Sequence, residues 1–411
     1  MVYNKRNFCL LRKLPFAVPE AAYFSIFGGI CPLEEIYFDN SATTRVCEEA
    51  AAKAVEMMTQ NYGNPSSLHT MGFRAEQELR AAREAVAKQL DAKPEEIYFT
   101  SGGTESNNIS LFGAAHARKK RGNRIVTTAI EHPSVLNAVK KLEQEGFEVV
   151  LLQPDRQGKI SPEDVREAVT PETILVSMMA VNNEVGSILP LEAAADAIEE
   201  KKAPALFHID AVQAFGKLPL RVRQLRADLM SVSAHKIHGP KGVGALIVRK
   251  GVHIEPLTYG GGQEKDMRPG TESMPLIAAF GAAVKALPDT EAELAAMREL
   301  NDSLRAELAK LPGITVNSPE DALPYILNFS AGGVRAETML HFLSDRGIYV
   351  SSGSACSKGR ESHVLKAMGL GRERIASALR LSFCRFNTKE ETQKFAAALS
   401  DGLAAITKRP L

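Results

Sequence analysis

Two ionisable residues stand at the ends of apolar segments, where side chains of this kind are uncommon. Asp210 closes the segment ALFHID, and Lys236 follows the segment DLMSVS just before a glycine-rich turn. A carboxylate in such a setting needs a cationic partner, because burial of an unpaired charge is costly. A lysine at the end of a strand in a buried site can have a lowered pKa and serve as a Schiff-base nucleophile. The pair therefore predicts a site for a cationic ring that carries an aldehyde.

A third feature is a turn that is suited to binding phosphate. In the segment IYFTSGGTESNN a predicted strand ends, Gly102 and Gly103 form a tight turn, and a helix begins near Thr104. Free backbone N–H groups at the start of a helix bind phosphate, and the helix dipole adds to the attraction. The turn matches neither the dinucleotide-binding pattern nor the P-loop, so on its own it is explained equally well as an ordinary connection. Together with Asp210 and Lys236 it completes the set of groups that pyridoxal phosphate requires.

A single cysteine lies in a polar segment further along the chain. The segment SSGSACSKGRESH surrounds Cys356 with serine and glycine, and Lys358 and Arg360 follow it. Structural cysteines usually lie among apolar neighbours, whereas nearby cations lower the pKa of a thiol and make it more reactive. We expect Cys356 to be a reactive thiol on an exposed loop; the alternative is an idle surface residue.

The other cysteines and histidines argue against a metal site and against a disulfide framework. The chain has five cysteines, which are widely spaced and form no C-x-x-C pair, unlike the cysteines of zinc, iron–sulfur or disulfide-linked proteins. His235 and His238 have no third ligand at a suitable spacing, so we expect no metal. Free thiols are typical of a reducing compartment, and we expect a cytoplasmic protein.

Composition excludes further classes of protein. Of the 411 residues, 45% are hydrophobic and 24% are charged, and the formal net charge is +1. So small a net charge gives no general attraction to nucleic acid or to an anionic membrane, and no apolar run has the length of a membrane span. Residues 1–34 contain an apolar stretch, but Pro15, Pro19 and Glu20 interrupt it. We therefore interpret residues 1–34 as a peripheral N-terminal extension and not as a signal peptide.

The segments that connect these features predict an α/β fold. Short β-rich runs alternate with helical or loop segments; the runs are EEIYFT, RIVTTAI, FEVVLLQ, TILVSMMAV, ALFHID, DLMSVS and GALIVR. This alternation predicts a large domain of residues 50–290, with a mostly parallel seven-stranded sheet covered by helices on both faces. A long charged helix begins near residue 290. We expect a smaller α/β domain that consists of residues 35–49 and 291–411 and carries the Cys356 loop.

The motifs of the chain resemble those of the cysteine desulfurases, in the class V aminotransferase group of fold-type-I pyridoxal-phosphate enzymes. The matching motifs occur in order from residue 36 almost to the end of the chain: YFDNSATT, NYGNPSSLH, TSGGTESNN, EHPSV, NNEVG, HIDAVQAFGK, SAHKIHGPKGVGAL, GGGQEKDMRPGT, SSGSACS and RLSFCRF. The resemblance implies the fold of a fold-type-I transferase, pyridoxal 5′-phosphate as cofactor, and a homodimer with shared active sites.

The resemblance also implies a role for each matching residue. Lys236 would form the Schiff base with the cofactor, His132 would stack on its ring and relay protons, and Cys356 would accept sulfur. Arg380 would bind the substrate carboxylate, with Asn183 beside it. The residues implied to bind the cofactor are Gly103, Thr104, Asn183, Asp210, Gln213, Ser233, His235, Lys236 and Thr271, the last reaching the phosphate bound by the neighbouring subunit.

The reaction that the resemblance implies is removal of sulfur from L-cysteine, which gives L-alanine and a persulfide on Cys356. The persulfide would pass to an acceptor protein, either an iron–sulfur scaffold or a transfer-RNA thiolation enzyme. A selenocysteine lyase of the same fold remains an alternative. A plain aminotransferase would have no use for Cys356, and a catalytically idle scaffold would not need Lys236 and Asp210. Cys384 stands where the family usually has glycine, on an expected strand, and we interpret it as a packing residue.

Overall fold

The computed structural model describes residues 35–352 and 361–406 of the chain. The predicted extension of residues 1–34 and the predicted sulfur acceptor Cys356 lie outside the described residues. The chain from Ile36 to Leu411 forms one compact unit, and its division into a large and a small domain stays a prediction. No helix in the described part of the chain is long and apolar enough to cross a membrane.

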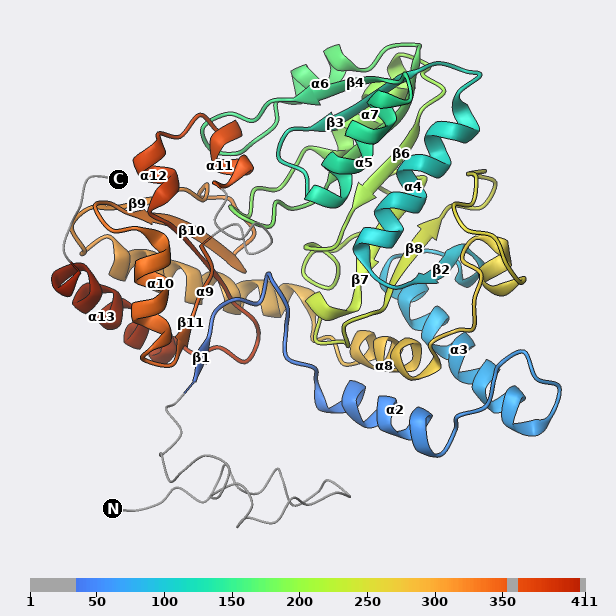
Figure 1. Cartoon of the computed structure of the whole chain (residues 1–411), viewed down its shortest axis with the longest axis horizontal. Coiled ribbons are helices and arrows are strands. Elements are labelled where there is room, and N and C mark those ends of the chain that lie inside the picture. The colour runs from blue at the N-terminus through green and yellow to red at the C-terminus, as the bar shows by residue number, and fades with distance from the viewer. Residues whose placement is uncertain (1–34, 353–360, 407–411) are drawn as a thin grey trace. The chain divides into compact units, whose positions relative to one another are not determined.

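A seven-stranded sheet lies at the centre of the fold (Figure 1). Its strands lie in the order β2-β8-β7-β6-β5-β3-β4. Strand β8 runs antiparallel to β7 and β2, and the other neighbouring pairs are parallel. The predicted mostly parallel sheet is therefore confirmed. The strands are β2 (Ile97–Thr100), β3 (Arg124–Thr128), β4 (Glu148–Leu152), β5 (Thr173–Met179), β6 (Leu206–Asp210), β7 (Leu229–Ser233) and β8 (Gly244–Val248).

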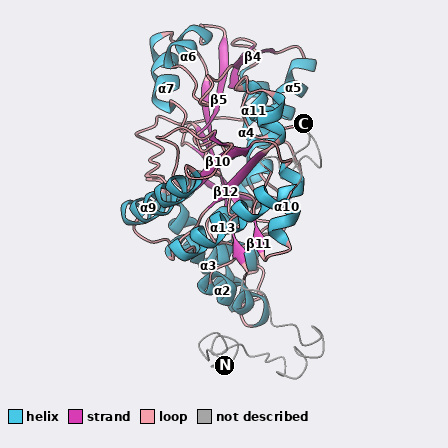
Figure 2. Cartoon of the chain, turned by 90° about the vertical axis from the view of Figure 1, so that its left-hand side faces the viewer, coloured by secondary structure: helices cyan, strands magenta, loops and turns pink. Residues whose placement is uncertain are grey.

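The central strands are apolar on both sides because helices cover both faces of the sheet. Strands β5 and β6 are buried at every position. Successive side chains point to opposite faces, so Leu175 and Leu206 join one apolar cluster while Val176 and Phe207 join another. Figure 2 shows two helices on either side of β5. They are α4 (Gly103–Arg118) and α5 (Pro133–Gln144) on one side, and α6 (Pro162–Ala168) and α7 (Leu191–Glu200) on the other.

Three further helices pack on one another next to this sheet (Figure 1). They are α2 (Glu48–Thr59), α3 (Thr70–Gln89) and α8 (Met274–Lys285). The loop between α2 and α3 and the loop before α8 carry several exposed apolar side chains, which are considered below.

A smaller antiparallel sheet follows the long helix α9 (Thr290–Leu308) in the chain. Its strand order is β12-β10-β9, and a short parallel pair of β1 and β11 lies near it (Figure 1). The strands are β1 (Ile36–Tyr37), β9 (Ile314–Val316), β10 (Ile326–Ala331), β11 (Ile348–Tyr349) and β12 (Ala378–Ser382). The helices are α10 (Ala336–Ser344), α11 (His363–Ala367), α12 (Arg372–Ala376) and α13 (Lys389–Ala405).

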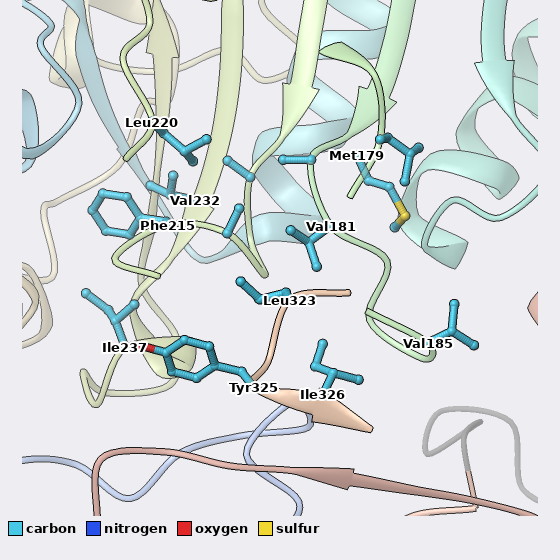
Figure 3. Close-up of a cluster of buried hydrophobic side chains, with 14 of the residues drawn as sticks. Met179, Val181, Val185, Phe215, Leu220, Val232, Ile237, Leu323, Tyr325 and Ile326 are labelled. Carbon is cyan, nitrogen blue, oxygen red and sulfur yellow. The ribbon is translucent and has the colours of Figure 1, made fainter. Parts of the chain in front are cut away.

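An apolar cluster joins the carboxyl ends of the large sheet to the start of β10 (Figure 3). Leu323, Tyr325 and Ile326 approach it from the small sheet, and all three are buried. The partners that the large sheet and its connections supply include Met179, Val181, Phe215, Val232 and Ile237. Burial of each large apolar side chain contributes about 1.5–3 kcal/mol. The cluster therefore holds β10 and its neighbour β12 firmly against the edge of the large sheet where the site lies.

One short loop contains three successive residues in the left-handed backbone conformation. Glu264, Lys265 and Asp266 have φ angles of 46°, 53° and 65°. The buried Glu264 carboxylate fixes the loop, because it accepts hydrogen bonds from Arg83 at 2.7 and 2.8 Å and from the Phe99 N–H at 3.0 Å. Asp266 is exposed, so contacts of its side chain contribute little free energy to offset the cost of its left-handed backbone.

We predict that Asp266→Gly raises the free energy of unfolding by about 0.5–1 kcal/mol. A left-handed residue with a Cβ costs about 1–2 kcal/mol, and the greater freedom of glycine in the unfolded chain offsets roughly half of this. Urea unfolding followed by circular dichroism would measure the change. Asp266→Ala is the control, since it removes the same carboxylate and keeps the Cβ. Equal stabilisation by both variants would show that charge, and not backbone strain, is responsible.

Candidate functional site

The predicted phosphate turn has the geometry of an anion cradle. Gly102 has a φ angle of 147°, which side chains disfavour, and α4 begins at the next residue. A Cβ on Gly103 would lie 2.6 Å from Val212 Cγ2, and a Cβ on Gly102 would lie 3.7 Å from Ser233 Oγ. A residue larger than glycine at position 103 would therefore clash with Val212. The Ser233 hydroxyl faces the turn. Thr104 is exposed beside it and lines a hollow of ≈ 500 Å³ together with His132.

A chain of hydrogen bonds links Asp210 at the end of β6 to His132 at the start of α5. Asp210 is 5% exposed, and its Oδ2 accepts a hydrogen bond from Asn107 Nδ2 at 2.8 Å. Asn107 Nδ2 also donates to Ser134 Oγ at 2.9 Å, which lies 2.8 Å from His132 Nδ1. The Val212 N–H donates to Asp210 Oδ1 at 3.0 Å. Asp210 is thus held by fixed donors, and its orientation is set before any ligand binds.

The same contacts define the state of His132. Its Nδ1 accepts a hydrogen bond from the backbone N–H of Ser134 at 3.2 Å, so the neutral ring carries its proton on Nε2. Burial lowers the pKa of His132, the negative charge of Asp210 opposes this, and the positive charge of Lys236 adds to it. The charges of Asp210 and Lys236 both reach His132, so His132 lies near each of these residues.

A tight turn of residues 39–44 lies over Lys236. Lys236 Nζ donates hydrogen bonds to the carbonyl oxygens of Ser41 and Ala42, both at 2.6 Å. Gln213 Nε2 donates to the Ser41 carbonyl as well, at 3.0 Å. His235 Nδ1 lies 3.3 Å from Thr43 Oγ1. The turn therefore brings three of the predicted cofactor-binding residues, Lys236, Gln213 and His235, to one wall of the site.

Burial keeps His235 neutral at this wall. It lowers the pKa of His235 to about 4, and the nearby charge of Lys236 acts in the same direction. A neutral imidazole can donate one hydrogen bond and accept another. This state suits a residue that helps to hold a phosphate beside a cation.

Arg380 lies on β12 at the opposite end of the 39–44 turn. Its side chain is 2% exposed and forms an ion pair with Asp39, with 2.7 Å between Nη2 and Oδ1. Its Nη1 donates to the backbone carbonyl of Asn183 at 2.9 Å. Asn183 thus contacts Arg380 through its main chain. The predicted substrate-binding pair is brought together by the structure.

Several buried polar atoms at the site lack a hydrogen-bond partner among the described residues: Gln213 Oε1, Asn107 Oδ1 and Arg380 Nε. Such atoms are costly to bury unless a ligand satisfies them. Gln213 Oε1 could accept a hydrogen bond from a ring hydroxyl, Gly102 and Gly103 could hold a phosphate, and Lys236 could bond an aldehyde. The residues present therefore fit pyridoxal phosphate.

The described residues on either side of the Cys356 segment contact this site. Before it, Ser351 exchanges two backbone hydrogen bonds with Arg380, at 2.7 and 3.1 Å. After it, His363 Nε2 lies 2.9 Å from the carbonyl oxygen of Glu131, the residue before His132, and Ser362 Oγ donates to Glu184. Ser362 also caps α11 through the N–H of Leu365. Both flanks thus contact residues next to those predicted to bind substrate and cofactor.

One prediction is wrong, and another is not tested by the structure. Cys384 was expected on a strand, but β12 ends at Ser382 and Cys384 lies in the turn that follows, where its N–H donates to Asn387 Oδ1 at 2.9 Å. The strand stops because the backbone of Cys384 bonds within this turn. Thr271 is exposed, and none of the hydrogen bonds described above involves it, so its role toward a neighbouring subunit stays a prediction.

Sequence reasoning did not single out Asn107, Ser134 or Asp39 as members of the site. Asn107 lies one helical turn after Gly103, inside the quoted motif TSGGTESNN, and Asp39 lies inside YFDNSATT. A polar side chain one turn into a helix that begins at a ligand turn faces the same side as the turn. That spacing was the available signal for Asn107. In the described part of the chain, no group of three or more His, Cys, Asp or Glu side chains is arranged to hold a metal ion.

Comparison with known proteins agrees with this geometry. The family model for class V aminotransferases matches residues 36–395. The chain belongs to the class V aminotransferase family. A "NifS/IcsS protein homolog" of Lactobacillus delbrueckii subsp. bulgaricus is 43% identical over 89% of this chain and 96% of the relative. A "Cysteine desulfurase IscS" of Clostridium botulinum is 42% identical over 87% of this chain and 91% of the relative.

Two solved structures of similar proteins have the same fold. A "NifS-like protein" superposes with a TM-score of 0.86 at 40% identity, covering 90% of this chain and 100% of that one. A structure described as "SspA in complex with cysteine" gives a TM-score of 0.76 at 35% identity, covering 86% and 100%. The predicted fold-type-I transferase fold and the dependence on pyridoxal phosphate are therefore confirmed.

We predict that Cys384 resists alkylation in the folded enzyme. Burial raises the pKa of its thiol to about 11, so the thiolate fraction at pH 8 is roughly 100-fold lower than for an unperturbed cysteine. Iodoacetamide labelling followed by peptide mass spectrometry would measure the rate in native enzyme and in concentrated urea. Comparable rates in both states would show that Cys384 is accessible and would contradict its role in packing.

Proposed function

We propose that the chain is a pyridoxal-phosphate-dependent cysteine desulfurase that converts L-cysteine to L-alanine and keeps the sulfur as a persulfide on Cys356. The observation that carries the proposal is the 39–44 turn. Its Ser41 and Ala42 carbonyls contact Lys236, its Asp39 carboxylate contacts Arg380, and Ser41 also contacts Gln213. A small amino acid can therefore reach the lysine with its amine and the arginine with its carboxylate. The names of relatives at about 40% identity support this choice of substrate.

When bound, pyridoxal phosphate supplies an aldehyde that bonds to amines and a ring that withdraws electrons from the substrate Cα. Asp210 would hold a proton on the ring nitrogen of the bound cofactor, because its carboxylate is fixed by Asn107 and Val212 and is almost fully buried. A carboxylate in such a low-dielectric setting strongly favours a cation beside it. His132 presents its Nε2 proton, since Nδ1 is occupied by Ser134.

Lys236 moves the proton at the substrate Cα. Its Nζ has two carbonyl acceptors in Ser41 and Ala42, and these oxygens stabilise the ammonium that forms when Nζ takes up a proton. Arg380 binds the substrate carboxylate, which fixes the Cα–H bond with respect to Lys236. His132 is near enough to Lys236 to sense its charge and is the second group able to relay a proton.

Cys356 takes the sulfur in the proposed reaction. Its thiolate attacks the substrate sulfur, an S–S bond forms and the substrate C–S bond breaks. The electron pair stays with the carbon skeleton, which gains a proton and leaves as L-alanine. The anchoring of Ser351 to Arg380 and of His363 to Glu131 supports this role, because both flanks of the cysteine segment are fixed next to the substrate site.

The proposal includes a homodimer, an acceptor protein and a cytoplasmic location. Large apolar side chains are exposed on α2, on α3 and in the loops beside α3 and α8: Met58, Tyr62, Leu68, Phe73 and Tyr259. Exposed apolar side chains of this size are typical of interaction surfaces. A second copy of the chain is proposed to bind this surface, and the exposed Thr271 lies in the loop expected to reach the cofactor phosphate bound by that second copy.

The persulfide would then be passed to an iron–sulfur scaffold or a transfer-RNA thiolation enzyme.

We predict that Lys236→Ala abolishes turnover but leaves cofactor binding. The variant keeps the phosphate turn and Asp210, so it should retain cofactor and lose the absorbance of the lysine-bound form. Alanine release from L-cysteine should fall at least about 1000-fold, because the variant loses both the amine that bonds the aldehyde and the group that removes the Cα proton. Lys201→Ala, which removes an exposed lysine beyond α7, is the matched control. Release of alanine by Lys236→Ala at the control rate would exclude the proposed mechanism.

We predict that Cys356→Ala stays coloured and still changes its spectrum on addition of L-cysteine, yet releases no alanine and forms no persulfide. The cofactor ligands are untouched, and only the sulfur acceptor is lost. Cys384→Ala should keep activity because that thiol has a packing role. Alanine release should be measured from both L-cysteine and selenocysteine. A wild-type enzyme that acts on selenocysteine alone would favour the lyase, and a Cys356→Ala variant as fast as wild type would remove Cys356 as the acceptor.

A further inference from the structure

The ion pair between Arg380 and Asp39 differs from an ordinary surface ion pair. The Arg380 side chain is 2% exposed and the Asp39 side chain is 20% exposed. Exposed pairs contribute little, but removal of one partner of a buried pair leaves an uncompensated charge and is strongly unfavourable. A buried arginine that must also receive a substrate carboxylate therefore needs a resident counter-ion that does not occupy all of its donors.

The hydrogen bonds of Arg380 leave such donors free. A guanidinium has five N–H groups in a fixed plane. One on Nη2 is taken by Asp39 and one on Nη1 by the Asn183 carbonyl, and the buried Nε has no partner among the described residues. Within the described part of the chain, three N–H groups of Arg380, including that on Nε, therefore have no partner and are available to a ligand. Two fixed contacts at different corners of the plane determine the direction in which these groups point.

The backbone of Asp39 is rigid enough to impose this orientation. Its carbonyl accepts hydrogen bonds from the N–H groups of Ala42 at 3.0 Å and Thr43 at 3.3 Å, and from the Tyr37 hydroxyl at 3.1 Å. Asp39 also forms a β-bridge with Ser382, two residues beyond Arg380 on the same segment. The carboxylate and the guanidinium are thus carried by paired backbone, and neither can move independently.

We propose that Asp39 is a positioning residue for the substrate carboxylate: it orients the Arg380 guanidinium and, through the 39–44 turn, fixes its position with respect to Lys236. The proposal rests on the proposed function, in which Arg380 binds that carboxylate. Asp39 touches Arg380 with its side chain, and the same turn supplies the Ser41 and Ala42 carbonyls that contact Lys236. The spacing between the two ends of the substrate is therefore set by one short segment.

The test compares a ligand that has a carboxylate with one that lacks it. L-Alanine and ethylamine present the same amine and methyl group, and only L-alanine has the carboxylate. Both would be titrated into holoenzyme and followed by the absorbance of the cofactor. Asp39→Ala should weaken L-alanine binding about 10-fold or more and leave ethylamine within about 2-fold of wild type. The KM for L-cysteine should rise by a similar factor, with a smaller change in kcat.

Asp39→Glu separates position from charge. It keeps the negative charge and moves the carboxylate by one methylene, so L-alanine should bind about 5-fold more weakly with no change for ethylamine. If Asp39→Ala does not fold, Asp39→Glu alone still allows the comparison of L-alanine with ethylamine. The matched control is Asp321→Ala, which removes an exposed aspartate that pairs with Lys159 and should bind both ligands as wild type does.

The proposal is overturned if Asp39→Glu binds L-alanine as tightly as wild type, or if L-alanine and ethylamine weaken equally, because equal loss indicates general damage to the site. Alanine release from L-cysteine by wild type is measured separately. Its absence would contradict the proposed function, whereas the comparison of L-alanine with ethylamine would still decide whether Asp39 orients the carboxylate site.

Discussion

Buried charge at the carboxyl ends of the central strands is the constraint on which the site depends. Asp210 and Arg380 are 5% and 2% exposed, and an unpaired charge at such a depth costs several kcal/mol. The fold meets this cost with fixed donors and acceptors, namely Asn107 and the Val212 N–H for Asp210, and Asp39 for Arg380. Asn107 lies near the start of α4, Val212 lies in the turn directly after β6, and Asp39 is bridged to Ser382. The apolar cluster between the two sheets then holds the two charged groups at a fixed separation (Figure 3).

The number of hydrogen-bonding atoms that already have partners also distinguishes functional polar side chains from structural ones. His208 on β6 is fully buried, and burial lowers its pKa to about 3. Both its ring nitrogens have partners, Ser177 Oγ at 2.8 Å and Ser231 Oγ at 3.0 Å, so it has no capacity left for a ligand. His132 also has a lowered pKa, but only its Nδ1 is occupied. The difference lies in unused hydrogen-bonding capacity, which the pKa alone does not reveal.

The sequence predicts those parts of the site that depend on local order, and it fails where distant segments meet. Asp210 and Lys236 were found because the ends of apolar strands can be recognised, and parallel neighbours place their ends at one edge. The contact of Arg380 with Asp39 joins residues 341 positions apart. It depends on how Asp39 bridges to Ser382, and no periodicity encodes that pairing. The same limit explains why the end of β12 was placed too far along the chain, since the turn around Cys384 is fixed by Asn387 and not by its own pattern.

Negative and positive side chains also lie on different sides of the site. Burial raises the pKa of Glu131 to about 8, and the nearby charge of Asp210 acts in the same direction, so Glu131 is largely protonated at pH 7. Of these two neighbouring carboxyl groups, Asp210 then carries the negative charge that faces the proposed position of the cofactor ring. On the other side, Lys217 is 6% exposed, and its Nζ lies 5.3 Å from the centre of the Tyr325 ring. Burial, with a smaller contribution from the charge of Arg380, lowers the pKa of Lys217 to about 8, so most of its positive charge remains at pH 7. In the proposed reaction, the positive charges of Lys217 and Arg380 attract the carboxylate of the incoming amino acid. The 39–44 turn contacts both Arg380 and Lys236, so it links the carboxylate site to the group that moves the Cα proton.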